Sequence, residues 1–353
     1  MADTTESLPA SYAAAGVNLE AADEAVRRIA TLVGSTHGPE VLDGIGGFGG
    51  SFALDVARMT APVLVASTDG VGTKLAVARA AGRYGTVGID LVAMCVDDLV
   101  CVGAEPLFML DYISTGHLDP VQVEALVGGV ADGCRTAGCA LLGGEIAEHP
   151  GEMEPGAVDM AGFAVGVVER DARLGPEKVI AGDVLIGLPS PGLRSNGYSL
   201  ARNVLFDRAG RSLAEAAWQG ADLTLADEML RPSVIYSPAV LAAARTGAVH
   251  AAAHITGGGI TGNLVRALPE GCAAVVDRSR WIEPAIFGEI RRLGPVDDAE
   301  MQRVFNLGIG MVLVVAHDRV DEVERAVRVT GVEDLVIGSV DSGTRGVRFV
   351  GAA

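Results

Sequence analysis

Apolar and polar positions along the first half of this chain follow two periods, one helical and one strand-like. Residues 20–33 repeat apolar side chains at helical spacing and end at Gly34, which predicts an amphipathic helix. β-branched and aromatic runs at 63–67, 107–115 and 159–168 predict strands, and we expect 63–67 to be a buried one. Helices and strands therefore alternate in this half.

Two further helices are predicted between those strands. Residues 87–102 are almost entirely apolar but carry three aspartates, which predicts a buried helix with a polar feature. Residues 120–137 have helical spacing, and Asp119 with Pro120 is a typical helix start, with Asp as the N-cap and Pro in the first position. The local signals therefore place both helices.

The polar, turn-rich stretch 169–182 predicts a domain boundary, with one domain at 1–170 and another at 171–353. Alternation continues beyond the boundary. The predicted elements are a strand at 183–188, helices from about Tyr198, at 234–246, after the TGGG loop and at 318–329, strands at 250–255 and within 305–316, and two short final strands. The fold class is accordingly α/β or mixed α+β.

Charge and composition narrow the possible functions. The formal net charge of −18 disfavours nucleic acid and anionic membranes as partners, because both need clustered basic side chains. A small phosphorylated substrate stays compatible, since it needs only a local anion site. No apolar run reaches the roughly 18 residues of a membrane span. The acidic, polar first ten residues do not resemble a signal peptide, and five cysteines, an odd number, favour reduced thiols in the cytosol.

The segment TDGVGTK follows the strand at 63–67 and gives the chain its first candidate for phosphate chemistry. Asp69 can hold Mg²⁺, while Gly70, Gly72 and Thr73 can bring donors close to phosphate oxygens and Lys74 can balance charge. The alternative is a glycine-rich surface turn. Only two lysines occur in the whole chain, and the retention of one of them here favours the functional interpretation.

Two other glycine-rich segments carry weaker signals. In GIGGFGG, Gly46, Gly47 and Gly49 could cover a phosphate, but a flexible loop is as probable, and no strand precedes the segment as a dinucleotide fold would require. Glu145 follows two glycines and could be a metal ligand, and a strand-end turn is the alternative.

The helix at 87–102 places Asp90, Asp97 and Asp98 close together in angle. At 100° per residue, Asp90 and Asp97 nearly eclipse each other and Asp98 lies about 80° away. Carboxylates in so apolar a helix are costly unless they are paired or bound to metal. A single solvated face is the alternative, and two adjacent aspartates favour function.

The second half offers two candidate anion sites at helix starts. Ser195 is expected to be an N-cap, with donors at the helix start that could bind an anion, and an ordinary capped helix is the alternative. In HITGGG, Thr256, Gly257 and Gly258 precede a helix and could form a phosphate cradle. His254 at the strand end could be catalytic, while a satisfied core histidine is the safer expectation.

Taken in order, the segments resemble one known family from about residue 11 to residue 350. The chain is similar to the phosphoribosylformylglycinamidine cyclo-ligases, also called aminoimidazole ribonucleotide synthetases. Its matching segments are SYAAAGV, GGFGG, TDGVGTK, GIDLVAMCV, GAEPLF, DY, GGE.AE, AGF.VGVVE, SNGYSL, HITGGG and FN.GIGM.

This resemblance implies a fold and a reaction. It implies a two-domain fold, ATP bound chiefly by the N-terminal domain, and a homodimer formed by two such domains. The family uses ATP to convert formylglycinamidine ribonucleotide to aminoimidazole ribonucleotide, ADP and phosphate. We therefore expect a cytoplasmic ligase of purine biosynthesis that uses Mg²⁺ with ATP.

The resemblance also implies roles for single residues. Asp69, Asp98 and Glu145 are carried over as ligands of Mg²⁺–ATP, and Lys74 as a phosphate contact, with Lys74 and Asp98 as catalytic residues. Two glycine-rich loops are expected to bind ATP. Their residues are Gly46, Gly47 and Gly49 in the first and Gly70, Gly72 and Thr73 in the second. Substrate is expected at Ser195, Asn196, His254, Thr256, Gly257 and Gly258.

Three positions depart from the family pattern. Ile146 stands for Thr, Arg194 for a His before SNGYS, and Asp97 for an Asn before Asp98. Arg194 matters most, because Arg cannot deprotonate where a His could carry a proton. Either that His is not essential or the chemistry here relies on another base. Because the family tolerates an amide at 97, we expect the charge to be needed at 98 only.

Other enzymes are expected to share this fold, and sequence features separate them. Selenophosphate synthetase would show a reactive Cys near the N-terminus, whereas the first Cys here is Cys95. A hydrogenase-maturation protein would end in a Cys motif, and this chain ends in VGAA. The larger amidotransferase-linked synthetase needs about twice the length. Thiamine-monophosphate kinase and a nucleotide-binding regulator without catalysis stay as alternatives, the latter disfavoured by the intact TDGVGTK.

Overall fold

A four-stranded sheet and a six-stranded sheet form the framework of the computed structural model, which describes residue 12 and residues 15–351. In the first sheet β4 runs antiparallel to β1 and β2, whereas β2 and β3 are parallel. In the order of the sheet, its strands are β1 (Pro62–Gly70), β4 (Val158–Glu169), β2 (Glu105–Thr115) and β3 (Ala140–Glu148).

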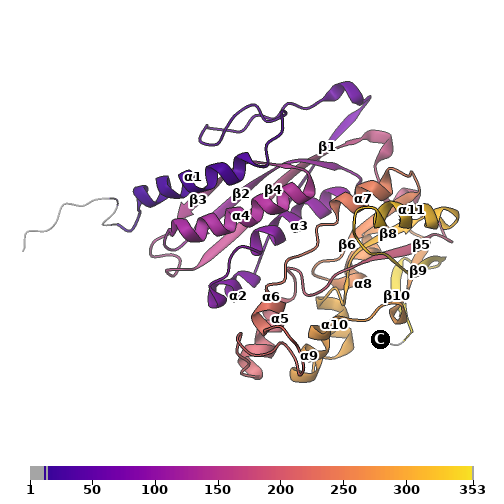
Figure 1. The fold of residues 1–353 in the computed structure, drawn as a ribbon. Helices are drawn as coiled ribbons and strands as arrows, with labels where there is room; N and C mark the ends of the chain where they lie inside the picture. The colour runs from indigo at the N-terminus through magenta and orange to yellow at the C-terminus, as the bar shows by residue number, and fades with distance from the viewer. Residues whose placement is uncertain (1–11, 13–14, 352–353) are drawn as a thin grey trace, which may run out of the picture.

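Three helices cover one face of this sheet: α1 (Leu19–Gly34), α3 (Val87–Val100) and α4 (Pro120–Ala137). They lie side by side across the strands in Figure 1. The side chain of Asp119 accepts the backbone N–H of Val121, which confirms the predicted start of α4. The short α2 (Lys74–Ala81) follows directly after β1.

The other face of the first sheet is bare in the single chain. Leu64 is 62% exposed, and Tyr112 and Phe163 are each 42% exposed. The prediction of a buried strand at 63–67 is therefore right about the strand and wrong about the burial of its outer side. Alternating exposure along β1 shows that only one face is covered.

The second sheet is mostly antiparallel, with β10 and β7 as its one parallel pair. In the order of the sheet, its strands are β10 (Gly346–Val350), β7 (Cys272–Asp277), β9 (Leu335–Ser342), β5 (Val184–Pro189), β8 (Ile309–Val315) and β6 (Val249–His254). Every residue of β8 is buried, as a strand covered on both faces requires.

Helices cover both faces of this second sheet. Helices α7 (Ser237–Ala244) and α11 (Val320–Arg328) pack on one face and α8 (Gly259–Leu264) packs on the other. The remaining helical elements are α5 (Tyr198–Arg202) with the π-helical turn Asn203–Arg208, α6 (Leu225–Met229), α9 (Ala285–Leu293) and α10 (Asp298–Val304).

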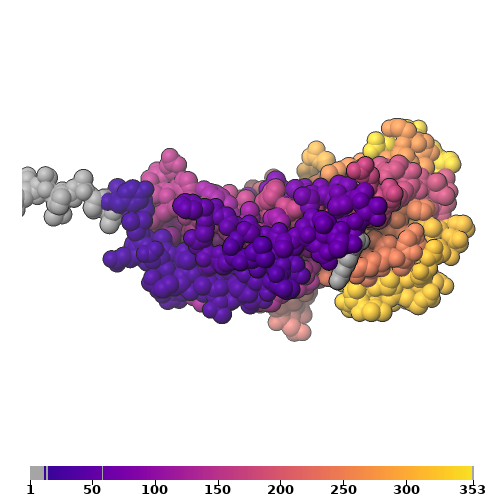
Figure 2. Space-filling model, turned by 90° about the horizontal axis from the view of Figure 1, so that it is seen from above, coloured from indigo at the N-terminus to yellow at the C-terminus, as the bar shows by residue number. Residues whose placement is uncertain are grey.

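One apolar cluster joins the two halves of the chain. It runs from α3 and α4 into buried side chains of the second half such as Tyr198, Met229 and Phe287. Seen from above, the molecule is elongated, with the early part of the chain at one end and the late part at the other (Figure 2). No helix in the described residues has the length and apolarity needed to cross a membrane.

The mixed α/β class is confirmed, and the predicted elements are present close to their predicted bounds. The pattern did not predict α2, α6, β7, α9 and α10. The SYAAAGV segment, one of those that carry the family resemblance, lies partly outside the described residues. The first ten residues lie outside them entirely.

Candidate active site

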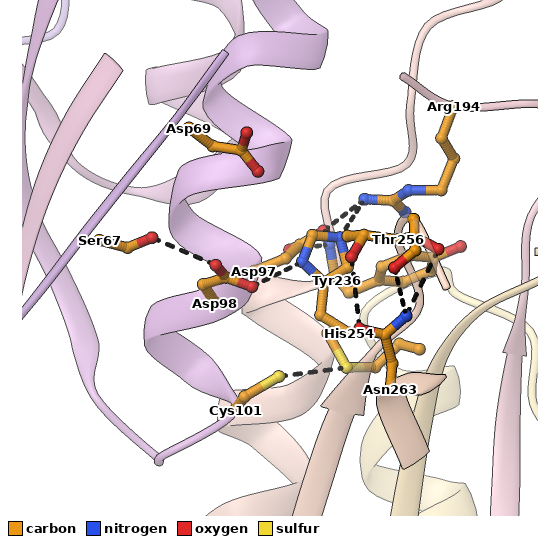
Figure 3. A network of polar contacts seen from close by, with 12 residues as sticks. Ser67, Asp69, Asp97, Asp98, Cys101, Arg194, Tyr236, His254, Thr256 and Asn263 are labelled. Carbon is orange, nitrogen blue, oxygen red and sulfur yellow. Dashed lines mark hydrogen bonds and ion pairs between the residues drawn. The ribbon is translucent and has the colours of Figure 1, made fainter. Parts of the chain in front are cut away.

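The last turn of α3 carries the most exposed of its carboxylates, at a cavity between the two sheets. Asp98 has a side chain that is 47% exposed. Its Oδ1 lies 2.9 Å from Nδ1 of His254, and its Oδ2 accepts from the Ser67 hydroxyl at 3.3 Å (Figure 3). One carboxylate thus joins β1, α3 and β6 at one point.

A second carboxylate lies close to Asp98. Asp69, near the end of β1, accepts the Gly70 N–H at 2.7 Å. Burial raises the pKa of Asp69, and the nearby charge of Asp98 raises it further. Burial also acts to raise the pKa of Asp98, but hydrogen bonds from His254 and Ser67 outweigh it and the net pKa is lowered. Two neighbouring carboxylates that repel each other in this way fit a Mg²⁺ ion, which favours one or two carboxylates plus phosphate oxygens.

The cavity beside Asp98 has a volume of about 410 Å³. Besides Ser67 and Asp98, its lining includes three charged residues, Arg173, Glu177 and Arg266. The positive charge of Arg266 contributes to lowering the pKa of Asp98. A cavity lined by basic residues and by Asp98 suits a ligand that brings both an anion and a metal.

Asp97 points away from the cavity and has other partners than Asp98, as the divergence of about 100° between adjacent helical residues predicts. It is fully buried, with Oδ2 at 2.9 Å from Nη2 of Arg194 and Oδ1 accepting the backbone N–H of Tyr236 at 2.8 Å. Burial raises the pKa of Asp97, against the opposing effect of Arg194. Two of the three departures from the family pattern are thus the two halves of one buried ion pair.

The two residues that follow Arg194 were predicted to bind substrate. Each has a polar side-chain atom without a hydrogen-bond partner. Ser195 Oγ and Asn196 Oδ1 are buried and have no hydrogen-bond partner. A Cβ on Gly257 would lie 3.9 Å from Nδ2 of Asn196, so the TGGG loop is adjacent. The hydroxyls of Thr73 and Ser199, 3.1 Å apart, join the TDGVGTK loop to the same place. Unpaired buried polar atoms point to a missing ligand.

The expected role of Ser195 as an N-cap is wrong. Helix α5 begins at Tyr198, and its N-cap is Gly197 in the left-handed region with φ 78°. A side chain there would meet the ring of Phe305 at 2.3 Å, so only glycine fits. The helix begins at Tyr198 as predicted, but its N-cap lies two residues after Ser195, which leaves the Ser195 hydroxyl available.

Asn263 holds the TGGG loop, a role that sequence reasoning missed. Its Nδ2 donates to the carbonyls of Thr256, Gly257 and Gly259 at 3.4, 3.2 and 2.9 Å. Gly258 takes φ 102° within this loop. The only available signal was an Asn one turn inside the helix that follows the glycines.

Lys74 does not line the cavity beside Asp98, and its predicted contact with phosphate stays a prediction. Its side chain is completely buried, with Nζ at 2.5 Å from Asp90 and donating to the carbonyl of Arg231 at 2.8 Å. Burial lowers the pKa of Lys74, opposed by the charge of Asp90. An ammonium engaged in this way stabilises the packing of α2 on α3.

Glu145 is the other predicted site residue that lies apart. It stands opposite Tyr112 in the sheet register, on the bare outer face, whereas Asp69 lies on the helix-covered side. No group of three metal-binding side chains occurs in the described residues. The structure therefore brings Asp69 and Asp98 together but not Glu145.

The GIGGFGG loop also lies elsewhere in the single chain. Gly46, Gly47 and Gly49 line a separate cavity of about 560 Å³, together with Asp111 and Glu145. That cavity has no lining residue in common with the one beside Asp98. Their predicted role in binding ATP stays a prediction.

Comparison with known proteins places this geometry in a family. Residues 54–168 match the model of the AIR synthase related protein N-terminal domain, and residues 181–351 match that of the C-terminal domain. The chain belongs to the AIR synthase family. A phosphoribosylformylglycinamidine cyclo-ligase of Symbiobacterium thermophilum is 53% identical over 94% of both chains, which confirms the resemblance found in the sequence.

Solved structures show how widely the fold of this family is shared. A thiamine-monophosphate kinase from Stenotrophomonas maltophilia has a TM-score of 0.68 at 21% identity, over 94% of this chain and 96% of the other. Hydrogenase maturation protein HypE in complex with ATP has a TM-score of 0.63 at 18% identity, over 92% and 91%. At these identities the comparison establishes only that the fold is shared, and it says nothing about function.

Proposed function

We propose that this chain is an ATP-dependent cyclo-ligase of purine biosynthesis, which closes formylglycinamidine ribonucleotide to aminoimidazole ribonucleotide. The observation that carries the proposal is the pair of neighbouring carboxylates Asp69 and Asp98, of which Asp98 lines the cavity, in a chain 53% identical to a cyclo-ligase. Neighbouring buried atoms of Ser195 and Asn196 lack partners and are suited to bind a polar substrate.

The chemistry needs an activated formamide. ATP transfers its γ-phosphoryl group to the formamide oxygen and leaves as ADP. The ribosyl-bearing nitrogen then attacks the activated carbon, a C–N bond forms, the C–O bond to phosphate breaks, and the ring closes. A protein catalyses such a sequence chiefly by positioning the two ends of the substrate and by stabilising phosphoryl charge.

The residues of the cleft divide this work. We assign Asp69 and Asp98 to hold Mg²⁺, which when bound would neutralise phosphate charge. His254 and Ser67 fix the orientation of Asp98. Arg266, which also lines the cavity, offers a positive charge near Asp98.

The substrate end of the site is assigned to two loops. Ser195 and Asn196 offer the substrate a hydroxyl and an amide that the protein leaves unpaired. The TGGG loop, at Thr256, Gly257 and Gly258, is held in shape by Asn263 and offers backbone groups.

The substrate dependence of ADP release tests the proposed function. We expect the purified protein to release ADP, with an equal amount of aminoimidazole ribonucleotide, only when formylglycinamidine ribonucleotide is present. Thiamine monophosphate is the matched control, because a kinase that acts on it shares the fold. Equal ADP release with thiamine monophosphate would overturn the assignment.

The bare face of the first sheet supports a homodimer. Apolar side chains of three strands, Leu64, Tyr112 and Phe163, are exposed there, and an apolar sheet face of this kind is typical of a protein interface. We propose that two copies pack these faces together. Light scattering should give twice the monomer mass of 36.1 kDa at micromolar concentration. The variant Leu64→Glu should shift the mass toward the monomer, and a monomeric parent would contradict the proposal.

Two further expectations belong to this proposal. The five cysteines are unpaired, which suits a reducing compartment, and we propose the cytoplasm. We also propose 1–170 and 171–353 as the two domains, because the first sheet ends at Glu169 and the second begins at Val184.

A further inference from the structure

Arg194 occupies an unusual place for a charged side chain. It lies in the loop after β5 with a positive φ of 62°, and its side chain is only 1% exposed. Its guanidinium lies over the Tyr236 ring, with Cζ 4.8 Å from the ring centroid, and Nη1 donates to the carbonyl of Val234 at 3.1 Å. These contacts hold the guanidinium plane in one orientation.

The same guanidinium contacts both Asp97 and His254. Nη2 lies 2.9 Å from Asp97 Oδ2 and 3.0 Å from His254 Nε2. On its other side the His254 ring contacts Asp98 through Nδ1 at 2.9 Å. Figure 3 shows the resulting chain of contacts, from Asp97 through Arg194 and His254 to Asp98.

The chemistry of the guanidinium decides where the proton of His254 lies. Arg is a donor only, so Nε2 of His254 must accept. The ring proton is then on Nδ1, where it can donate to Asp98 Oδ1. A proton on Nε2 would instead point at the guanidinium nitrogen.

We propose that Arg194 is a positioning residue: it fixes His254 as the Nδ1–H tautomer and thereby fixes Asp98 toward the cavity. The proposal rests on the proposed function for the role of Asp98, but the tautomer follows from the contacts alone. Asp97 is the counter-charge that makes a buried Arg194 tolerable. The pair therefore acts on the site without touching substrate.

The proposal explains how a chain with Arg at 194 can use this site. Arg cannot act as a proton carrier, but it can fix the orientation of the histidine that supports a ligand carboxylate. Partners behind a ligand group are worth about 10- to 100-fold in affinity or activity. The arrangement also makes His254 Nε2 unavailable as a general base, because its lone pair is already used.

The test compares variants that differ in their hydrogen-bond donor and keep the buried charge balanced. Arg194→Met with Asp97→Asn removes the donor and both charges, while the Asn oxygen can still accept from Tyr236. Arg194→Lys keeps the charge and is again a donor only. Arg278→Met is the matched control, a buried arginine in ion pairs on the far side of the second sheet, whose partners Glu283 and Asp298 retain Arg291.

The first readout is the ¹⁵N spectrum of the ring nitrogens of the substrate-free protein, with ¹⁵N-labelled histidine and His254→Gln for assignment. We expect Nδ1–H alone in the parent, in Arg194→Lys and in Arg278→Met. In the Met/Asn double variant we expect Nε2–H or a mixture, because free imidazole favours Nε2–H. A parent with Nε2–H or mixed tautomers would overturn the proposal, whatever reaction the protein catalyses.

The second readout is kcat for ring closure. We expect the Met/Asn double variant to lose about 10- to 100-fold, with circular dichroism unchanged, and Arg194→Lys to keep most of the activity. A double variant with altered tautomer but parental kcat would overturn the positioning role. Absence of ring closure in the parent would instead refute the proposed function and leave the tautomer result intact.

Discussion

The two ends of helix α3 carry aspartates in opposite surroundings. At its first turn Asp90 is completely buried, with Lys74 at 2.5 Å and with both the backbone N–H and the hydroxyl of Ser233 donating to Oδ1. Every charge at this end has a partner within the protein. The end is a closed polar network, and it joins α2, α3 and the segment before α7.

At the last turn the network is open. Asp98 is half exposed beside the cavity, and Asp69 lies close enough for its pKa to be raised by the charge of Asp98. Ser195 and Asn196 nearby keep unpaired atoms. The comparison teaches that charge in an apolar helix does not by itself identify a catalytic group. The group to choose is the one that the protein leaves incompletely paired.

The largest expected effect is at the open end. Asp98→Asn removes a charge that we assign to Mg²⁺, so turnover should fall by about 10²- to 10³-fold, and the Mg²⁺ concentration for half-maximal rate should rise. Steady-state kinetics over a Mg²⁺ titration measures both. Asp318→Asn, an exposed change outside the cleft, is the control. Turnover within a few-fold of the parent would show that Asp98 is not part of the chemistry.

The closed end should respond in stability. Lys74→Met leaves Asp90 buried without its cation, which should cost about 3 to 5 kcal/mol of unfolding free energy. Adding Asp90→Asn removes the stranded charge and keeps an oxygen for Ser233, so most of that loss should be recovered. Urea denaturation of the two variants measures the difference. Equal free energies of unfolding for the single and the double variant would show that the Lys74–Asp90 ion pair does not contribute to stability.

A third carboxylate sharpens the comparison, because it is buried without a cation. Burial raises the pKa of Asp111 to about 7, and its Oδ2 has no partner. The folded state then holds this proton more tightly than the unfolded chain, so stability should fall as pH rises between the ordinary pKa of 3.8 and about 7.

Asp111→Asn should remove that slope and stabilise the protein at pH 8 by about 1 to 3 kcal/mol. Denaturation midpoints across pH 4 to 8 measure it. Asp171→Asn, an exposed change just after β4, should leave the slope as it is. A parent whose stability does not change over this range would contradict the expected burial cost.

The smallest effect is expected at Ser67. Its hydroxyl donates to Asp98 at 3.3 Å, a long bond at a half-exposed carboxylate. Ser67→Ala should lower kcat by about fivefold, the equivalent of roughly 1 kcal/mol. Ser339→Ala is a matched control, since Ser339 is also a strand serine that donates to an aspartate, at 3.4 Å. A loss as large as that of Asp98→Asn would mean that Ser67 itself contacts the ligand.

Local signals in the sequence predicted local structure well. The start of α4 at Asp119 and Pro120 and the divergence of Asp97 from Asp98 both depend on neighbouring residues, and both are confirmed. The motifs also identified the family, because their order along the chain is a property of the sequence itself.

The rest depends on contacts between distant segments, which spacing cannot show. Lys74 was singled out correctly as unusual, but its partner Asp90 follows after a helix and a turn, and nothing local predicts their contact. Glu145 was expected at a strand end, whereas β3 continues to Glu148 and turns that side chain to the outer face. The ion pair of Asp97 with Arg194 joins positions 97 residues apart.

The central claim is that chemistry occurs at the open end of α3 and stability is maintained at the closed end. Ring closure measured side by side in Asp98→Asn and in the double variant Lys74→Met with Asp90→Asn tests it most directly. The account predicts that the double variant keeps turnover within a few-fold of the parent, while Asp98→Asn loses at least about 10²-fold. A folded double variant that is inactive, beside an active Asp98→Asn, would contradict it.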